Sequence, residues 1–130
     1  HQPHRCAALL LGDHAAITKN HHIDCTNRIT IGPFTTIAGY HSQLLSHSID
    51  LQHNRQHSEP ITIGPYCFVG SNCVILGGSE LPHHSVLGAL SLLNKVHIEP
   101  WSLYAGQPAR RLKAIQADAA YFSRRQGYVV

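Results

Sequence analysis

One polar segment, residues 43–60, concentrates side chains that can move protons or bind charge. It contains three histidines, two carboxylates, one asparagine and one arginine: His47, Asp50, His53, Asn54, Arg55, His57 and Glu59. Imidazole exchanges its proton near neutral pH, so it suits a general base acting on a weakly nucleophilic hydroxyl. Asp50, three residues after His47, or a backbone carbonyl would orient the ring and stabilise its charged form. The segment therefore predicts proton-transfer chemistry.

Positive charge is concentrated at the C-terminal end of the chain. Residues 1–100 carry five Lys or Arg and six Asp or Glu, whereas residues 101–130 carry five and one. The basic residues lack interleaved aromatic side chains and a recognisable readout motif, so nucleic acid is not an expected partner. Lys95 and Arg110 are predicted to meet the phosphates of an anionic ligand. Arg124 and Arg125 are interpreted as solvated surface.

Length and composition favour one domain over residues 1–130, since 43% of the 130 residues are hydrophobic. No apolar run approaches the roughly 18 residues that would span a bilayer. The cysteines form no CxxC pair or zinc-finger spacing, and we expect four reduced, buried thiols: Cys6, Cys25, Cys67 and Cys73. The sequence begins without Met, so we expect it to be cut from a longer chain.

A six-residue period identifies the elements that would position these groups. Aliphatic residues recur every six positions at Leu11, Ile17, Ile23 and Ile29 and, after a shift of two residues, at Ile31 and Ile37. The period resumes at Ile63, Val69, Ile75, Leu81, Leu87 and Leu93. Four residues after each anchor of the second run stand mostly small side chains: Cys67, Cys73, Ser79, Ser85, Ser91 and His97. Neither a helix nor a simple alternating strand has this period, whereas a parallel β-helix does. The alternative, buried strands of a sandwich, would not keep the phase for so long.

The period predicts an all-β chain with three kinds of segment. Residues 11–42 and 61–108 are expected to form β-helix coils, and residues 43–60 a protruding active-site loop. After Gly106-Gln107-Pro108, the spacing of Leu112, Ile115, Ala119 and Phe122 predicts a C-terminal α-helix over residues 109–126. Such a helix would cover the open end of the coil stack.

The order of motifs resembles that of the hexapeptide-repeat acyltransferases, above all their sugar O-acetyltransferase branch, which includes maltose, galactoside, capsule and exopolysaccharide acetyltransferases. The resemblance covers about residues 11–113 and rests on the repeats, the His-bearing loop, Gly88-Ala89-Leu90-Ser91 and Ala105-Gly106-Gln107-Pro108-Ala109. It implies a left-handed parallel β-helix, acetyl-CoA as acyl donor, a homotrimer with active sites between subunits, and a cytoplasmic location.

The resemblance also implies roles for individual residues. His47 stands at the position of the catalytic base, and the backbone N–H of Ser71 would hold the thioester oxygen. Acetyl-CoA would be bound by Gly70, Ser71, Gly88, Ala89, Asn94, Lys95, Pro108 and Arg110. Phe68 replaces a frequent Trp in the acyl pocket, and Asp24 aligns with an Asn that contacts the acceptor. Apart from the resemblance, His53 or His57 of the loop could touch the acceptor, the alternative being that both are solvated.

The expected activity is acetyl transfer from acetyl-CoA to a hydroxyl of a sugar or polysaccharide precursor, with an amino group as the nearest variant acceptor. A non-catalytic β-helix that serves as a structural or assembly subunit is the alternative. The γ-class carbonic anhydrases, a related family, bind zinc through histidines on adjacent strands. The spacings from His41 to His47 and from His53 to His57 do not reproduce their pattern, so no metal is expected.

Overall fold

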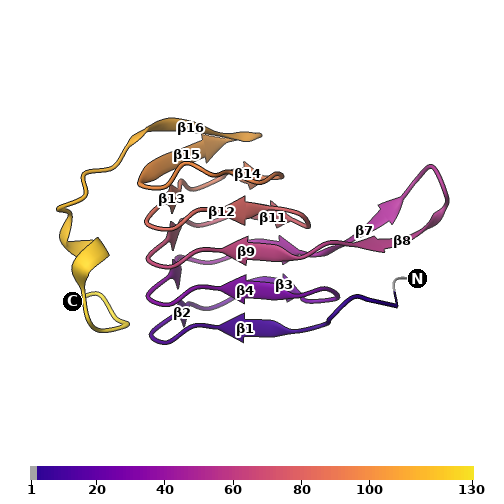
Figure 1. Cartoon of the computed structure of the whole chain (residues 1–130), viewed down its shortest axis with the longest axis horizontal. Helices are drawn as coiled ribbons and strands as arrows, with labels where there is room; N and C mark the ends of the chain where they lie inside the picture. The colour runs from indigo at the N-terminus through magenta and orange to yellow at the C-terminus, as the bar shows by residue number, and fades with distance from the viewer. Residues whose placement is uncertain (1–2) are drawn as a thin grey trace.

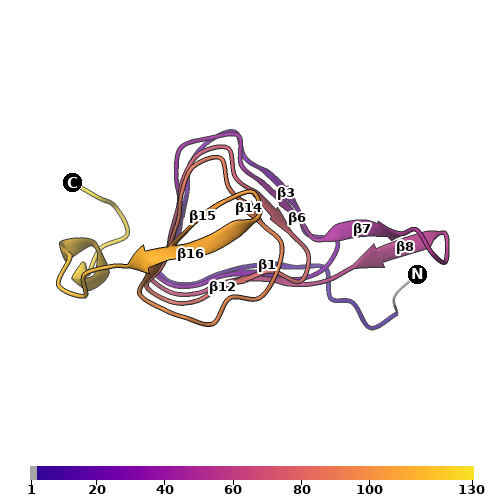
Figure 2. The same cartoon turned by 90° about the horizontal axis from the view of Figure 1, so that it is seen from above.

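The six-residue period winds the chain into stacked triangular coils, which the computed structural model describes for residues 3–130 (Figures 1 and 2). The strands of the first face are β1 Leu9–Leu11, β4 Ile29–Ile31, β9 Ile61–Ile63 and β12 Glu80–Leu81. Those of the second face are β2 Ala16–Ile17, β5 Thr36–Ile37, β10 Phe68–Val69, β13 Val86–Leu87, β15 Ser102–Gly106 and β16 Ala109–Ala114. Those of the third face are β3 His22–Asp24, β6 Gln43–Leu45, β11 Val74–Leu76 and β14 Leu92–Leu93. All neighbouring strands on the faces pair in parallel except β15 and β16, so the predicted parallel β-helix is confirmed.

The anchors of the period fill the interior of the prism. All six anchors of the second run, from Ile63 to Leu93, are at most 1% exposed. The residues that follow the anchors are small, because the corners of the coils offer little space and contain hydrogen-bonded polar groups. The Thr35 hydroxyl, for example, donates to the Gly64 carbonyl at 2.6 Å and accepts from the Cys67 N–H at 2.9 Å, which joins successive coils. Buried hydroxyls that are bonded in this way avoid the cost of an unpaired polar group.

The corner between the first and second faces carries a stack of five aromatic side chains, named here the aromatic corner: His14, Phe34, Tyr66, His84 and Trp101. Neighbouring ring centroids lie between 4.3 and 5.0 Å apart. All five residues have a positive φ between 53° and 61°. One tight turn therefore recurs on every coil and places each ring above the previous one.

The protrusion predicted over residues 43–60 is a β-hairpin with narrower bounds. Gln43–Leu45 is β6, which pairs with β3 and β11 in the third face. The hairpin consists of β7 His47–Asp50 and β8 Arg55–Ser58, which pair antiparallel and project away from the prism (Figures 1 and 2). The corner from which it projects, between the third and first faces, is named here the hairpin corner.

The prediction of an α-helix over residues 109–126 is wrong. Ala109–Ala114 is β16, which turns back at Gln107 and Pro108 and pairs antiparallel with β15, the last strand of the second face. An open sheet edge offers the chain a row of backbone hydrogen bonds, and this tertiary pairing outweighs the helical spacing of the apolar residues. A short 3₁₀ helix, η1 Ala120–Ser123, follows, and Phe122 packs on Trp101 at the aromatic corner.

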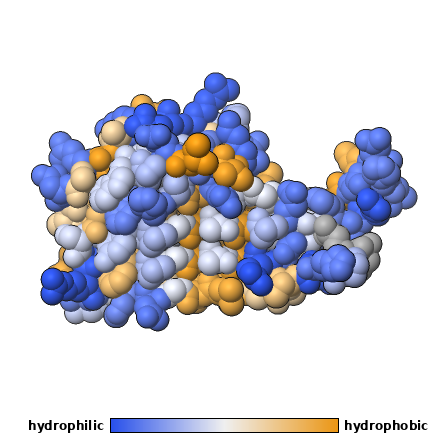
Figure 3. Space-filling model, in the orientation of Figure 1, coloured by the Kyte–Doolittle hydropathy of each residue, from blue (hydrophilic) through white to orange (hydrophobic). Residues whose placement is uncertain are grey.

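The first coil is less buried than those above it. Leu9 and Leu11 are 37% and 52% exposed, whereas Ile29 and Ile31, their partners on the next coil, are fully buried. The prediction of buried cysteines holds for Cys67 and Cys73 but is wrong for Cys6, which is exposed, while Cys25 is half-buried. Figure 3 shows the exposed apolar side chains as an orange band under β1. Within residues 3–130, no helix is long and apolar enough to cross a bilayer.

Candidate functional site

His47 is fixed at the base of the hairpin by contacts from two directions. Its backbone N–H donates to Oδ2 of Asp24 on β3 at 3.3 Å, and its Nε2 contacts Oε1 of Gln56 on β8. Because an amide oxygen only accepts, this contact favours the tautomer with the ring proton on Nε2, in which Nδ1 is the nitrogen that accepts a proton. The ring is half-buried. The hairpin therefore presents a positioned imidazole with one nitrogen able to accept a proton.

Asp24 ties the hairpin corner to the third face. Its Oδ1 accepts from the Thr26 hydroxyl at 2.6 Å and from the Thr26 N–H at 3.0 Å. The Thr26 hydroxyl holds the pKa of Asp24 below its ordinary value, against a smaller opposing effect of burial. Its other oxygen, Oδ2, meets the N–H of His47, so in this structure Asp24 positions the candidate base.

Asp50 does not orient His47. Residues three apart on a strand point to opposite faces, and Asp50 on β7 accordingly faces away from His47. Its Oδ2 lies 2.8 Å from Nδ1 of His53 and 3.6 Å from Nε of Arg55. The bond from His53 is the main cause that lowers the pKa of the Asp50 carboxyl. Asp50 and His53 thus pair with each other at the far end of the hairpin.

Four of the predicted donor-binding residues lie at the corner between the second and third faces, named here the small-residue corner: Gly70, Ser71, Gly88 and Ala89. The coils approach closely there. A Cβ on Gly70 would lie 2.9 Å from the Ala89 nitrogen, and the Ser71 hydroxyl occupies the space that a Cβ on Gly39 would need. Close stacking of the coils thus requires small residues at these positions.

The other predicted residues are distributed around the top of the prism. Asn94 and Lys95 are exposed and follow β14, so they share the hairpin corner with His47 on a higher coil. Arg110 is exposed on β16, and Pro108 lies in the turn before it. Phe68 is half-buried on the second face, where its ring packs edge-on against Tyr121.

One chain does not bring His47 and the small-residue corner together. The strands of the third face separate the two corners, and six residues from Ser71 to Gly77 span about 15–20 Å at roughly 3.3 Å per residue. Of the residues that contact or flank His47, sequence reasoning missed Gln56 and Asn27. Gln56 could have been found from the alternation of side chains between the two faces of a hairpin. Ser58 on β8 is the register partner of His47, and Gln56, two positions before Ser58, lies on the same face.

Solved structures similar to this chain include acetyltransferases, as the sequence resemblance predicted. A hexapeptide-repeat acetyltransferase of Vibrio cholerae O1 biovar eltor, solved with acetyl-CoA, is 31% identical with a TM-score of 0.76, over 83% of this chain and 61% of that one. A maltose O-acetyltransferase of Clostridium difficile 630 is 21% identical with a TM-score of 0.75, over 83% and 59%. The coils thus match those of left-handed β-helix acetyltransferases.

Sequence comparison alone gives a shorter match. A chloramphenicol acetyltransferase of Klebsiella aerogenes is 33% identical over 51 residues, which are 39% of this chain and 24% of that protein. No protein-family model matches the sequence. The chain therefore spans less than two thirds of the length of these relatives, in sequence and in structure.

Proposed function

We propose that the protein transfers an acetyl group from acetyl-CoA to a hydroxyl of a sugar or polysaccharide precursor, with His47 as general base. The observation that carries the proposal is the held imidazole at the hairpin corner, between Asp24 and Gln56. The acetyl-CoA complex of the Vibrio cholerae relative supports the donor. Because acetyl-CoA is an intracellular metabolite, the proposal assigns the reaction to the cytoplasm.

The chemistry needs one base and one donor of hydrogen bonds. Nδ1 of His47 removes the proton of the acceptor hydroxyl while its oxygen attacks the thioester carbonyl carbon. The carbonyl oxygen gains negative charge, which the backbone N–H of Ser71 stabilises. The carbon–sulfur bond then breaks, and the imidazolium returns its proton to the departing thiolate. No covalent bond to the protein forms.

The donor would lie along the small-residue corner, since the small side chains there would admit the pantetheine arm. Gly70, Gly88, Ala89 and Pro108 would line the arm, and the exposed side chain of Arg110 would meet the nucleotide end. Asn94 and Lys95, at the hairpin corner, would meet the nucleotide end of a donor held by a neighbouring copy. Phe68 would limit the acyl pocket, while Asp24 and His53 would contact the acceptor.

A homotrimer would complete the site. The third face turns four aliphatic side chains outward, all half-buried in the single chain: Leu45, Val74, Leu76 and Leu92. Packing this face against another copy would bury them. The interfaces of a cyclic trimer are heterologous, so the hairpin corner of one copy lies beside a different corner of the next. That arrangement would join His47 to a donor that it does not reach within its own chain.

The test combines donor binding with turnover. We expect calorimetry to detect acetyl-CoA binding to a particle that light scattering measures as three chains. Thiol release should then depend on an added glycan or nucleotide sugar. A folded protein that binds no acetyl-CoA at millimolar concentration would contradict the proposal and favour the non-catalytic alternative.

A further inference from the structure

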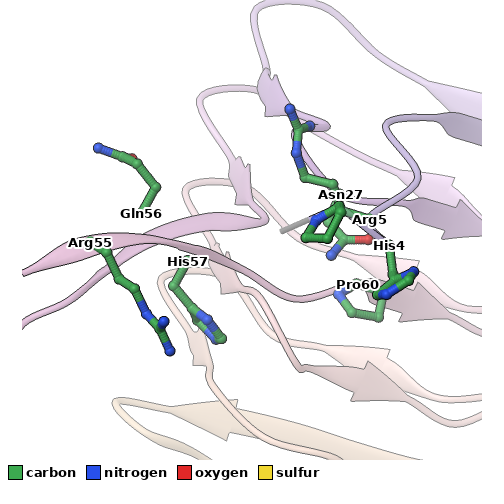
Figure 4. A pocket seen from close by; sticks show the side chains of 8 residues that line it. His4, Arg5, Asn27, Arg55, Gln56, His57 and Pro60 are labelled. Carbon is green, nitrogen blue, oxygen red and sulfur yellow. The ribbon is translucent and has the colours of Figure 1, made fainter. Parts of the chain in front are cut away.

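A cleft lies between the N-terminal segment and the hairpin, next to the candidate base. It has a volume of about 580 Å³, and its lining includes His4, Arg5, Asn27, Arg55, Gln56 and His57 (Figure 4). None of its lining residues is acidic, whereas two are arginines and two are histidines. We propose that this cleft binds the carboxylate or phosphate of an extended, anionic acceptor. This inference rests on the proposed function, because it names the class of its acceptor.

Arg5 provides one wall of the cleft with a fixed cation. Its Nη1 donates to the Thr26 carbonyl at 2.6 Å, which anchors the guanidinium, and among the described residues no other hydrogen bond engages it. Within residues 3–130, no carboxylate forms an ion pair with Arg5. A planar guanidinium held in place recognises carboxylate or phosphate oxygens in pairs.

The hairpin lines the cleft through three consecutive residues of β8, whose side chains alternate between the two faces of the strand. Figure 4 shows Arg55 and His57 on one side of the ribbon, and Gln56 and the guanidinium of Arg5 on the other. Arg55 is 65% exposed and lies 3.6 Å from the Asp50 carboxylate, while Nε2 of His57 lies 3.8 Å from Glu59. The two carboxylates hold these side chains on this side of the hairpin, Asp50 offsets part of the charge of Arg55, and the Arg55 terminal nitrogens remain open to a ligand.

Gln56 connects the cleft to the proposed chemistry. It lines the cleft and also contacts Nε2 of His47 on the other face of the hairpin. The charged group and the reacting hydroxyl of an acceptor therefore lie on opposite sides of the hairpin edge. An acidic oligosaccharide or a diphosphate-linked sugar is long enough to reach around this edge, whereas a free monosaccharide is not. The cleft thus selects for both charge and length.

Four acceptors separate these requirements in steady-state kinetics with acetyl-CoA: glucose, maltotriose, an oligogalacturonate and UDP-N-acetylglucosamine. We expect the two extended anions to have the lowest KM, and the better of them identifies the anion as carboxylate or phosphate. Their KM should rise with ionic strength, because salt screens exposed charges. A KM for maltotriose equal to or below those of both anions would overturn the inference.

Charge-removing variants test the cleft itself. Arg5→Gln and Arg55→Gln should each raise the KM of the preferred anion about tenfold, since each removes a charge-assisted hydrogen bond. The kcat value, the KM of acetyl-CoA and the KM of maltotriose should stay within about twofold. Arg125→Gln, which makes the same change at an exposed site outside the cleft, is the matched control and should alter none of them.

Direct titration keeps this inference separate from the proposed activity. Calorimetry of the oligogalacturonate and of UDP-N-acetylglucosamine, without donor, should show binding that weakens in Arg5→Gln and Arg55→Gln but not in Arg125→Gln. Such binding without turnover on any acceptor would contradict the proposed function and leave the anion cleft standing. Turnover with no difference between the variants and the control would overturn the cleft and leave the activity standing.

Discussion

The aromatic corner and the hairpin corner are built on the same repeat, and each carries histidines, but the partners of these histidines differ. At the aromatic corner, His84 lies between Tyr66 and Trp101 with centroid distances of 5.0 and 4.3 Å. At the hairpin corner, His47 contacts an amide and the chain folds outward. The two histidines therefore differ in their neighbours, and histidine abundance alone does not indicate a site.

The C-terminal segment strengthens the aromatic corner. The Arg124 guanidinium lies 4.0 Å from the centroid of the Tyr121 ring, and the Tyr121 hydroxyl donates to the Cys67 carbonyl at 2.7 Å. The hydroxyl of Tyr66, within the stack, donates to the Arg124 carbonyl at 2.9 Å. In the part of the chain that the structure describes, nothing comparable covers the hairpin, whose outer residues from Leu51 to Gln56 are all exposed. We therefore expect substitutions at one corner to change stability and at the other to change activity.

The largest expected effect is the loss of turnover in His47→Ala. Removing a general base should lower kcat by about 10²–10⁴-fold, because the acceptor hydroxyl then loses its proton only to water. Acetyl-CoA binding and the melting temperature should change little, since the ring is half-buried and lies outside the prism core. His84→Phe, measured beside it, should keep its turnover. Near-full activity in His47→Ala would remove His47 from the chemistry.

The next largest effect concerns stability at the aromatic corner. Tyr66→Ala should lower the free energy of unfolding by about 2–3 kcal/mol, since it removes a ring stacked between two others and a hydroxyl bond. Tyr66→Phe keeps the ring and should cost only about 1 kcal/mol, the typical net value of one hydrogen bond. Urea unfolding monitored by circular dichroism measures both. Equal losses in the two variants would assign the stability to the hydroxyl and not to the stack.

Gln56→Ala should have a smaller effect on the proposed reaction. Without the amide oxygen, the ring proton of His47 is no longer confined to Nε2, and kcat should fall about tenfold with little change in the KM of acetyl-CoA. Gln56→Glu restores an acceptor and adds a negative charge, which favours the imidazolium. The pH profile of kcat/KM should therefore move to higher pH in Gln56→Glu. An unmoved profile together with a normal kcat in Gln56→Ala would deny Gln56 a positioning role.

The smallest expected effect is a dependence of stability on pH at the aromatic corner. Burial lowers the pKa of His84 below 6.5, with a further contribution from His83. Well above pH 6.5 the ring is neutral in both the folded and the unfolded state and contributes no pH dependence. As the pH falls below 6.5 the unfolded chain takes up the proton first, so the free energy of unfolding decreases.

His84→Phe isolates this contribution. Phe34 and Tyr66 show that the turn accepts an aromatic ring at the same positive φ, so the variant should keep the stack while it loses the proton site. The difference in melting temperature between pH 7.5 and pH 5.5 should be smaller in His84→Phe than in the parent protein. His97 and His21 have pKa values that burial also lowers, so part of the dependence should remain. An unchanged dependence would show that His84 does not titrate within this range.

The period predicted the coils because one aliphatic residue per strand must fill the narrow interior. Ile63, Ile75 and Leu93 are all fully buried. The helix predicted after Pro108 failed because β15 offers a hydrogen-bonding edge that spacing cannot reveal. The aromatic corner did leave a signal in the sequence, since Phe34 and Tyr66 each follow a Gly-Pro pair. The meaning of that signal depends on the stacking of coils that lie about 18 residues or more apart in the chain.

The candidate site was harder to predict than the coils. His47 was predicted from the family resemblance, and the structure shows what holds it. The prediction that Asp50 orients His47 was wrong, because residues three apart lie on one face of a helix but on opposite faces of a strand. Arg5 is far from Gln56 in the sequence, and no motif marks either residue. The fold of the hairpin brings both to the lining of one cleft.

The stacked position of Trp101 gives the protein an internal optical reporter. It is the single tryptophan of the chain, and its indole lies 4.3 Å from the ring of His84 and 5.3 Å from Phe122 of the C-terminal segment. Protonated imidazole quenches indole emission more strongly than the neutral ring does. Steady-state fluorescence can therefore follow the protonation of His84 and the detachment of the C-terminal segment without any added label.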